Sequence, residues 1–451
     1  MSFPRYPAYR DSGTQWLPSI PAHWTVQRLR RIATLNPSKS EAAALPRSTA
    51  VSFLPMEAIG DDGSLQLDRN RPIGELESGY TYFKEGDVAI AKITPCFENG
   101  KGAVMRGLSH GLGFGTTELI VARPQPKHLD STYLHRVFTS HAFRHLGAAS
   151  MYGAGGQKRV PDDFVRDFVM ALPPIEEQRT INDFLDRETA KIDALVAEQE
   201  RLIALLKEKR QAVISHAVTK GLDPSVPMKD SGVEWLGQVP AHWSVVALNH
   251  RYEIALGKML DEKRVSGNHL APYLRNVDVQ WDRINVEELP QMDFNGSDLD
   301  RYGLRVDDLL VCEGGDVGRS AIWRGELTEC YYQKALHRLR PRDVEADLPR
   351  FQFYLMQAAA KLDVFSGGQG KATIVHLTAE ALRRYKFAYP GRAEQVQVVE
   401  HLDEAVGRLD KLIDEAANAS QLLQERRSAL ISAAVTGQID VRGLVTGQAA
   451  A

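Results

Sequence analysis

The segment Asp11-Ser-Gly-Thr-Gln-Trp-Leu-Pro-Ser-Ile-Pro-Ala-His-Trp24 returns in the second half of the chain as Asp230-Ser-Gly-Val-Glu-Trp-Leu-Gly-Gln-Val-Pro-Ala-His-Trp243. Two further stretches repeat at one common offset: Glu177-Gln178 returns as Glu394-Gln395, and 212–219 returns as 429–436. This spacing far exceeds the roughly 20–50 residues of solenoid repeats. The chain therefore contains a duplicated domain and a duplicated connector, and the two copies fill almost all of its 451 residues.

The connectors predict two long helices that follow the prolines at Pro173-Pro174 and Pro390. Apolar residues step by threes and fours along one helix face in the first connector and recur in the second at the same offset as Glu177 and Glu394. These positions are Ile181, Leu185, Ile192, Leu195, Leu202, Leu206 and Val213, then Val398, Leu402, Leu409, Leu412, Ala419, Leu423 and Leu430. Each helix should run for roughly 35–40 residues, or about 50–60 Å. Because neither apolar seam could be buried alone, we expect the helices to pack antiparallel on each other. Two unrelated amphipathic helices, each lying on its own domain, are the alternative.

Two segments of mixed character precede these helices. Short β-like runs at Asp87–Ile93 and Asp308–Cys312 are followed by Gly-rich turns, by second runs at Glu118–Pro124 and Ala335–Pro341, and by the helical stretches Tyr133–Phe138 and Arg350–Met356. The predicted fold class is mixed α/β, with two duplicated α/β domains separated by two long antiparallel coiled-coil helices and a pseudo-two-fold axis. The predicted bounds are 1–172 and 217–389 for the domains, 173–216 and 390–440 for the helices, and 441–451 for a C-terminal tail.

Composition is that of an ordinary soluble globular protein, with 43% hydrophobic and 25% charged residues and a net charge of −3. No apolar run approaches the roughly 18 residues of a bilayer span, and the N-terminus lacks the apolar region of a signal peptide, so we expect no membrane contact and a cytoplasmic location. Cys96, Cys312 and Cys330 show neither zinc-ligand spacing nor an even disulfide set. Two similar domains related by a two-fold axis suit double-stranded DNA, which requires a local basic face rather than a basic total.

Catalytic motifs are missing from this sequence. A phosphate-binding loop needs a hydroxyl residue for magnesium, but Ala372 follows Gly370-Lys371, and Ser366 stands at the loop start. The turn 314–320 resembles a dinucleotide loop but lacks a following periodic helix. Adenine-methyltransferase, helicase and nuclease motifs are not found, and His23 has no second metal ligand at useful spacing. We therefore expect no catalytic residue, no metal site and no cofactor in this chain.

Three groups of motifs closely resemble the specificity subunits of Type I restriction-modification systems. They are Leu172-Pro-Pro-Ile-Glu-Glu-Gln-Arg-Thr-Ile181, the repeated Gly13…Trp16-Leu17…Pro21…His23-Trp24, and Gly86-Asp-Val-Ala-Ile-Ala-Lys-Ile-Thr-Pro95 with Asn99-Gly-Lys101. The resemblance covers nearly the whole chain in the family's order. The second copy departs from it at Tyr389-Pro-Gly-Arg-Ala-Glu-Gln395, where the double proline is lost.

This resemblance implies that the two variable segments are target recognition domains, each reading one half of a bipartite, asymmetric site on double-stranded DNA. The helices would be spacers that also dock two modification (methyltransferase) subunits. Restriction motor-nuclease subunits would complete the complex. S-adenosylmethionine, ATP and magnesium would then be bound by the partner subunits, which carry out adenine methylation and restriction.

DNA contacts are nominated by residue type and loop context, because Lys, Arg, Asn and Gln donate to bases or phosphates and acidic side chains accept from cytosine. In the first domain the candidates are Lys92, Thr94, Asn99, Lys101, Gln157, Lys158 and Arg159. In the second they are Glu313, Asp316, Arg319, Gln333, Lys334, Gln369 and Lys371. For any single residue, a solvated surface position is the alternative. Asp11, Trp16, His23 and Trp24 are instead expected to pack and cap the start of the domain.

Two other functions remain open at the level of sequence. One is the specificity subunit of a methylation or defence complex that lacks the restriction motor, which neighbouring genes would distinguish. The other is a structural coiled-coil scaffold with no DNA role, which binding to duplex DNA beside a methyltransferase partner would exclude.

Overall fold

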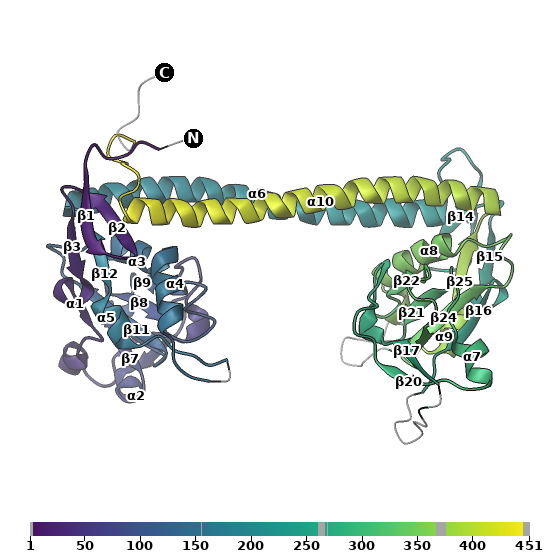
Figure 1. Ribbon diagram of the computed structural model, residues 1–451, viewed down its shortest axis with the longest axis horizontal. Helices are drawn as coiled ribbons and strands as arrows, with labels where there is room; N and C mark the ends of the chain where they lie inside the picture. Colours follow the sequence, from purple (N-terminus) through teal and green to yellow (C-terminus); the bar gives the residue numbers. More distant parts are fainter. Residues whose placement is uncertain (1–2, 155, 260–266, 268, 367–375, 445–451) are drawn as a thin grey trace. The chain divides into compact units, whose positions relative to one another are not determined.

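The computed structural model describes residues 3–154, 156–259, 267, 269–366 and 376–444, and Figure 1 labels many of its elements. The chain divides into two compact units: unit 1 comprises 1–199 and 418–451, and unit 2 comprises 200–417. Each unit contains one mixed α/β domain and one part of each of the two long helices, α6 (Ile175–Lys220) and α10 (Arg392–Val435). Both units are therefore built from the same kinds of parts.

The domain of unit 1 contains two four-stranded sheets, ordered β4-β11-β8-β9 and β6-β5-β10-β7, and the two-stranded pairs β1-β2 and β12-β3. Its strands are β1 (Tyr9–Thr14), β2 (Leu17–Pro21), β3 (Thr25–Arg28), β4 (Ala33–Leu35), β5 (Ala50–Leu54), β6 (Asn70–Pro72), β7 (Thr81–Lys84), β8 (Val88–Ala91), β9 (Gly102–Val104), β10 (Leu112–Gly115), β11 (Leu119–Pro124) and β12 (Val169–Leu172). Its shorter helices are α1 (Leu29–Ile32), α2 (Ile73–Leu76), α3 (Ser131–Thr139), α4 (His141–Ser150) and α5 (Asp162–Asp167).

The domain of unit 2 repeats this plan with sheets β16-β24-β21-β22 and β20-β17-β23, and with the pairs β13-β14, β15-β25 and β18-β19. Its strands are β13 (Met228–Asp230), β14 (Gln238–Pro240), β15 (Ser244–Ala247), β16 (Tyr252–Leu256), β17 (Leu270–Leu274), β18 (Val279–Gln280), β19 (Arg283–Ile284), β20 (Gln291–Asp293), β21 (Leu309–Cys312), β22 (Ser320–Ile322), β23 (Tyr331–Tyr332), β24 (Leu336–Pro341) and β25 (Lys386–Tyr389). Its shorter helices are α7 (Ser297–Tyr302), α8 (Pro349–Lys361) and α9 (Ala379–Arg384).

The duplication extends through the variable middles of the domains, where the two sequences differ most. In each domain a late strand pairs in parallel with an early one, β10 with β5 and β23 with β17. The central strands β8 and β21 are buried at every position, as expected for strands covered on both faces. All six predicted strand and helix stretches of the two domains are confirmed, and most of their apolar residues are buried.

Each long helix begins where the sequence predicted. The Pro174 carbonyl accepts from the Glu177 and Gln178 amides, and acidic side chains occupy the first turn, where they favour the positive end of the helix dipole. The helices contain 46 and 44 residues, more than the expected 35–40. The helices continue for additional turns at their C-terminal ends, where Ala217 and Val218 in α6, and Ala434 and Val435 in α10, are buried in the domain cores.

The predicted heptad seam is wrong at its centre. Leu195, Leu202 and Leu412 are 52%, 41% and 47% exposed, so they do not line the helix pair. The observed inner positions still step by threes and fours and recur at the common offset of the repeat: Ile192, Val196, Gln199, Ile203, Leu206, Arg210 and Val213, then Leu409, Ile413, Ala416, Ser420, Leu423, Arg427 and Leu430. Because several of these positions are polar, regularly spaced leucines in the sequence do not reveal the inner seam.

The helix halves pair in opposite order within the two units. In unit 1 the first part of α6 shares a core with the last part of α10, and in unit 2 the last part of α6 shares a core with the first part of α10. Arg427 binds Asp193 at 2.8 Å in unit 1, and the equivalent Arg210 binds Asp410 at 2.7 Å in unit 2. This reversed pairing confirms the predicted antiparallel arrangement.

Candidate DNA interface

One carboxylate, buried in unit 1 and partly exposed in unit 2, anchors the repeated start of each domain to its long helix. Glu177 accepts from the Trp24 indole at 3.1 Å and contacts His23 Nε2 at 2.8 Å. Glu394 makes the same contacts with Trp243 and His242, at 3.0 and 2.8 Å. The expected packing role of His23 and Trp24 is confirmed. Trp16 likewise stacks on Phe168, and Asp11 caps its own turn through the Gly13 amide.

The glutamine that follows each carboxylate joins the helix start to the domain core. The Gln178 side chain accepts from the Asp130 amide and donates to the carbonyls of His128 and Pro173, at 2.8 to 2.9 Å. Gln395 repeats all three bonds with Leu348, Ala346 and Pro390. Because both glutamines are fully buried, these bonds fix each domain on its helix.

A second duplicated contact is an arginine–aspartate ion pair, whose aspartate directly precedes the central strand of each domain. Arg123 binds Asp87 through two hydrogen bonds of 2.7 and 2.8 Å, and Arg340 binds Asp308 through two of 2.7 and 2.6 Å. Both carboxylates are 1% exposed and also accept a backbone amide. Bidentate geometry holds the planar guanidinium in place, so the strand that follows each aspartate is rigid. The sequence pattern did not single out these four residues.

Lys92 and Glu313 occupy the same position at the ends of these strands. The Lys92 amide donates to the Glu118 carbonyl and its own carbonyl accepts from the Val160 amide, at 2.8 and 2.9 Å. Glu313 makes the equivalent bonds with Ala335 and Leu377, at 3.0 and 2.7 Å. Both side chains are partly exposed, and within the described residues neither makes a side-chain hydrogen bond. The duplicated scaffold thus presents opposite charges at one position.

The structure brings the first-domain candidates of 92–94 and 157–159 together. The Thr94 amide donates to the Lys158 carbonyl at 2.9 Å, and Arg159 makes hydrogen bonds of 2.8 and 2.9 Å to the Glu118 carboxylate. These bonds hold the pKa of Glu118 below its usual range. Lys158 and Gln157 remain exposed on the outside of this loop, beside Tyr152, which is 63% exposed and which the sequence reasoning missed.

Lys101 and Arg319 are held inside the scaffold at equivalent places. The Lys101 ammonium donates to the Met56 carbonyl at 3.2 Å, and Arg319 donates to the carbonyl and side chain of Asn276 at 3.0 and 2.9 Å. Each cation precedes a strand of one sheet and binds the turn that follows a strand of the other. This arrangement favours a positioning role for both cations over direct contact with DNA.

The remaining described candidates are likewise either bound by another side chain or at least partly exposed. The Thr94 hydroxyl donates to Glu98, and Asp316 accepts from the Trp281 indole at 2.9 Å. Asn99 and Lys334 are exposed and Gln333 is partly exposed. Gln369 and Lys371 lie outside the described residues. Aromatic residues in variable loops are the signal that could have added the exposed Tyr152 and the partly buried Trp281 to the candidates.

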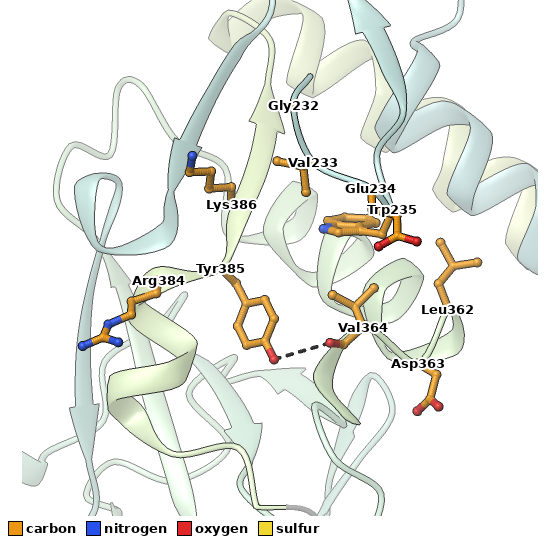
Figure 2. A pocket seen from close by; sticks show the side chains of 10 residues that line it. All are labelled: Gly232, Val233, Glu234, Trp235, Leu362, Asp363, Val364, Arg384, Tyr385 and Lys386. Carbon is orange, nitrogen blue, oxygen red and sulfur yellow. Dashed lines mark hydrogen bonds between the residues drawn. The ribbon is translucent and has the colours of Figure 1, made fainter. Parts of the chain in front are cut away.

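A pocket of about 740 Å³ in unit 2 is lined by residues of 232–235, 362–364 and 384–386. Figure 2 shows Trp235 and Tyr385 among its lining side chains, with the Tyr385 hydroxyl donating to the Val364 carbonyl at 3.4 Å. The nominated DNA residues are not among the ten residues that line it.

Comparisons with known proteins point to one family. The Type I restriction modification DNA specificity domain matches residues 240–418. The chain is 42% identical over 164 residues to the EcoAI specificity subunit and 38% identical over 188 residues to the EcoEI specificity subunit, both from Escherichia coli. These matches cover 36% and 41% of this chain but only 27% and 31% of the relatives, so the chain matches about a third of their length.

Solved structures share the fold. A chain from a study of complex assembly and conformational transition in the type I R-M system has a TM-score of 0.73 and 18% identity, over 92% of this chain and 98% of that one. The HsdS subunit of Thermoanaerobacter tengcongensis has a TM-score of 0.54 and 18% identity, over 93% and 98%. The mixed α/β fold class is therefore confirmed.

Neither a metal-binding cluster nor a membrane-spanning helix is found in the described part of the chain. Within the described residues, no cluster of three or more His, Cys, Asp or Glu side chains could hold a metal ion. In the same part of the chain, no helix has the length and apolar character needed to cross a bilayer.

Proposed function

We propose that this chain, which belongs to the family of Type I restriction-modification specificity subunits, recognises a bipartite, asymmetric DNA site and directs adenine methylation and restriction by partner subunits. The chain itself would be non-catalytic. S-adenosylmethionine, ATP and magnesium would be bound by two modification subunits and by restriction motor-nuclease subunits.

The observation that carries this proposal is the pair of equivalent strand ends at Lys92 and Glu313. One rigid scaffold is used twice, and each copy offers a different chemistry at the same place. A lysine can bind the O6 and N7 acceptors of guanine, whereas a glutamate accepts from the N4 amine of cytosine. Two such domains in one chain would read two different half-sites.

Exposed leucines support the docking of modification subunits on the long helices. Leu195 and Leu412 are equivalent residues, as are Leu205 and Leu422, and all four are 47% to 63% exposed. Unit 1 carries Leu195 and Leu422, and unit 2 carries Leu205 and Leu412. Large exposed apolar side chains that recur in this way favour protein contacts. Their duplication matches two copies of one partner.

Charge reversal at the equivalent positions tests the reading function. In cells that carry this chain with its modification partner, Lys92→Glu should change the first half of the methylated site and Glu313→Lys the second. Each change should cost roughly 1–3 kcal/mol on the original site. Methylome sequencing identifies the altered half directly. An unchanged site in both variants, or loss of binding to cognate and random duplexes alike, would remove these residues from the reader set.

Lys158→Ala is the matched control for phosphate contact. Because phosphate contacts carry no sequence information, this change should weaken binding to all duplexes and reduce the salt dependence by about one counterion unit. Arg159 is left intact in this experiment, since its removal would also free Glu118 and disturb the loop.

A further inference from the structure

A groove of about 580 Å³ lies in unit 2, where the last turns of α6 meet the first turns of α10. Its apolar lining includes Ala212, Val213 and Leu222, and its polar lining consists of Lys209, His216 and His401. Among the described residues that line it, none is acidic. Leu222 is 42% exposed, and the His401 side chain is also exposed.

The equivalent place in unit 1 is covered in part by the chain itself. Phe184 and Leu430 are the repeat equivalents of His401 and Val213, and they are only 1% and 7% exposed. The Phe3 ring packs edge-on against Phe184 at 5.5 Å, and Ile439 belongs to the same buried core.

The covering segment is held by polar contacts as well. Arg187 on α6 donates to the Leu444 carbonyl at 3.0 Å, and the Asp440 amide donates to the Pro4 carbonyl at 2.8 Å. Val441, a residue of this segment, is fully buried in the same core as Ile439. Residues 439–444 therefore form a packed cover over the helix pair of unit 1.

The groove of unit 2 is open because the chain takes a shorter path there. Gly437 and Gly221 begin the same turn, with φ of +74° and +76°, and pack against Trp24 and Trp243. From Gly221 the chain reaches strand β13 through residues 221–227, ending with the Ala241 amide bonded to the Pro227 carbonyl. Within the described residues, unit 2 therefore has no counterpart of the cover formed by 439–444.

We propose that this groove binds a linear segment of another protein that carries an aliphatic or aromatic anchor beside a carboxylate. The cover of unit 1 supplies the shape of the occupant: a short stretch with apolar side chains on an antiparallel helix pair. The basic lining supplies its charge, because Lys209 and the two histidines face no acidic residue of the described lining. A carboxylate on the incoming segment would complement them.

A peptide of residues 438–444, Gln-Ile-Asp-Val-Arg-Gly-Leu, labelled with fluorescein, is a suitable probe because it contains both features. Its binding to the full chain is measured by fluorescence anisotropy. We expect saturable binding that Ala212→Trp weakens on the order of tenfold, equal to about 1.4 kcal/mol, by filling the groove. Lys209→Glu and an Asp-to-Asn change in the peptide should each weaken it several-fold.

The duplication provides the control. Ala429 is exposed and is the repeat equivalent of Ala212, so Ala429→Trp places the same side chain on unit 1 and should leave binding unchanged. Absence of saturable binding, or equal effects of the two tryptophans, would overturn the proposal. A dimer of this chain that Ala212→Trp dissociates in light scattering would show that the occupant is a second copy, and the partner assignment would fail.

Discussion

Glu177 and Glu394 perform the same task with different numbers of partners. Glu177 is 7% exposed and also accepts from the Tyr6 hydroxyl at 2.8 Å, and burial together with this bond raises the pKa of Tyr6. Glu394 is 30% exposed, and in the described part of the chain it accepts from no tyrosine. The cost of removing one carboxylate oxygen should therefore differ between the copies.

We expect Glu177→Gln to lower the free energy of unfolding by roughly 1–3 kcal/mol, because a buried polar network is left incompletely satisfied. Glu394→Gln should cost less, about 1 kcal/mol or below, because water can reach the site. Denaturant unfolding of both variants measures the two losses. Equal losses would show that the extra Tyr6 contact adds no stability.

We expect His135 to make unit 1 sensitive to acid. Its side chain contacts the Gly102 carbonyl at 3.0 Å, and burial lowers its pKa from 6.5 to about 4. Since the folded state disfavours the charged ring, the unfolded chain binds more protons below pH 6.5, and stability is lost as the pH falls toward 4. One pKa unit corresponds to about 1.4 kcal/mol, so the loss should reach about 3 kcal/mol by pH 4. Calorimetry should show the difference between wild type and His135→Gln shrinking across this range; a constant difference would contradict this expectation.

At the scale of elements, α6 presents exposed leucines on a face separate from its inner seam. The inner face contains the polar seam residues Gln199 and Arg210, whereas Leu195, Leu202 and Leu205 share an outer face of α6 at a spacing of seven and three positions. Exposed leucines that recur on one helix face outside the seam favour a binding partner. The predicted seam combined residues of both faces.

Leu205→Asp and Leu422→Asp separate docking from folding. Because both side chains are more than half exposed, each change should alter stability by no more than about 0.5 kcal/mol. Each should, however, remove one modification subunit from the complex, as counted by native mass spectrometry. Ala197→Asp, on another face of α6, is the control. A complex with two modification subunits in all three variants would exclude this face as the docking surface.

At the scale of the whole molecule, each domain is closed by a two-stranded ribbon that provides clear boundaries for exchange. Strands β3 and β12 pair Arg28 with Val169, and β15 and β25 pair Ala247 with Lys386. Residues 29–168 thus lie between the paired strands β3 and β12, and residues 248–385 lie between the paired strands β15 and β25. Each can be replaced without cutting a core strand.

Replacing 29–168 with the equivalent segment of a relative should change one half of the methylated site and leave the other half intact. The buried bonds of Glu177 and Gln178 remain in such a chimera, apart from those to His128 and Asp130, which the relative must supply. Methylome sequencing reads the outcome. Exchange of 248–385 should change the other half. A site altered in both halves by one exchange would contradict the modular function.

The sequence by itself determined the duplication, the two long helices and the main strands. Repeated motifs and apolar runs can be recognised directly from the order of the residues, without knowledge of tertiary contacts. The tertiary structure alone decided which helix face is inner, since Gln199 and Arg210 enter the seam only through packing against the other helix. The tertiary structure also decided which candidate side chains are held by other residues of the chain and which are not. Arg159 is bound by Glu118, Lys101 by Met56 and Arg319 by Asn276, whereas Lys92 and Glu313 stand at one equivalent position with no side-chain hydrogen bond among the described residues. These relations join parts of the chain that lie far apart in sequence, and only the folded backbone brings such residues within hydrogen-bonding distance.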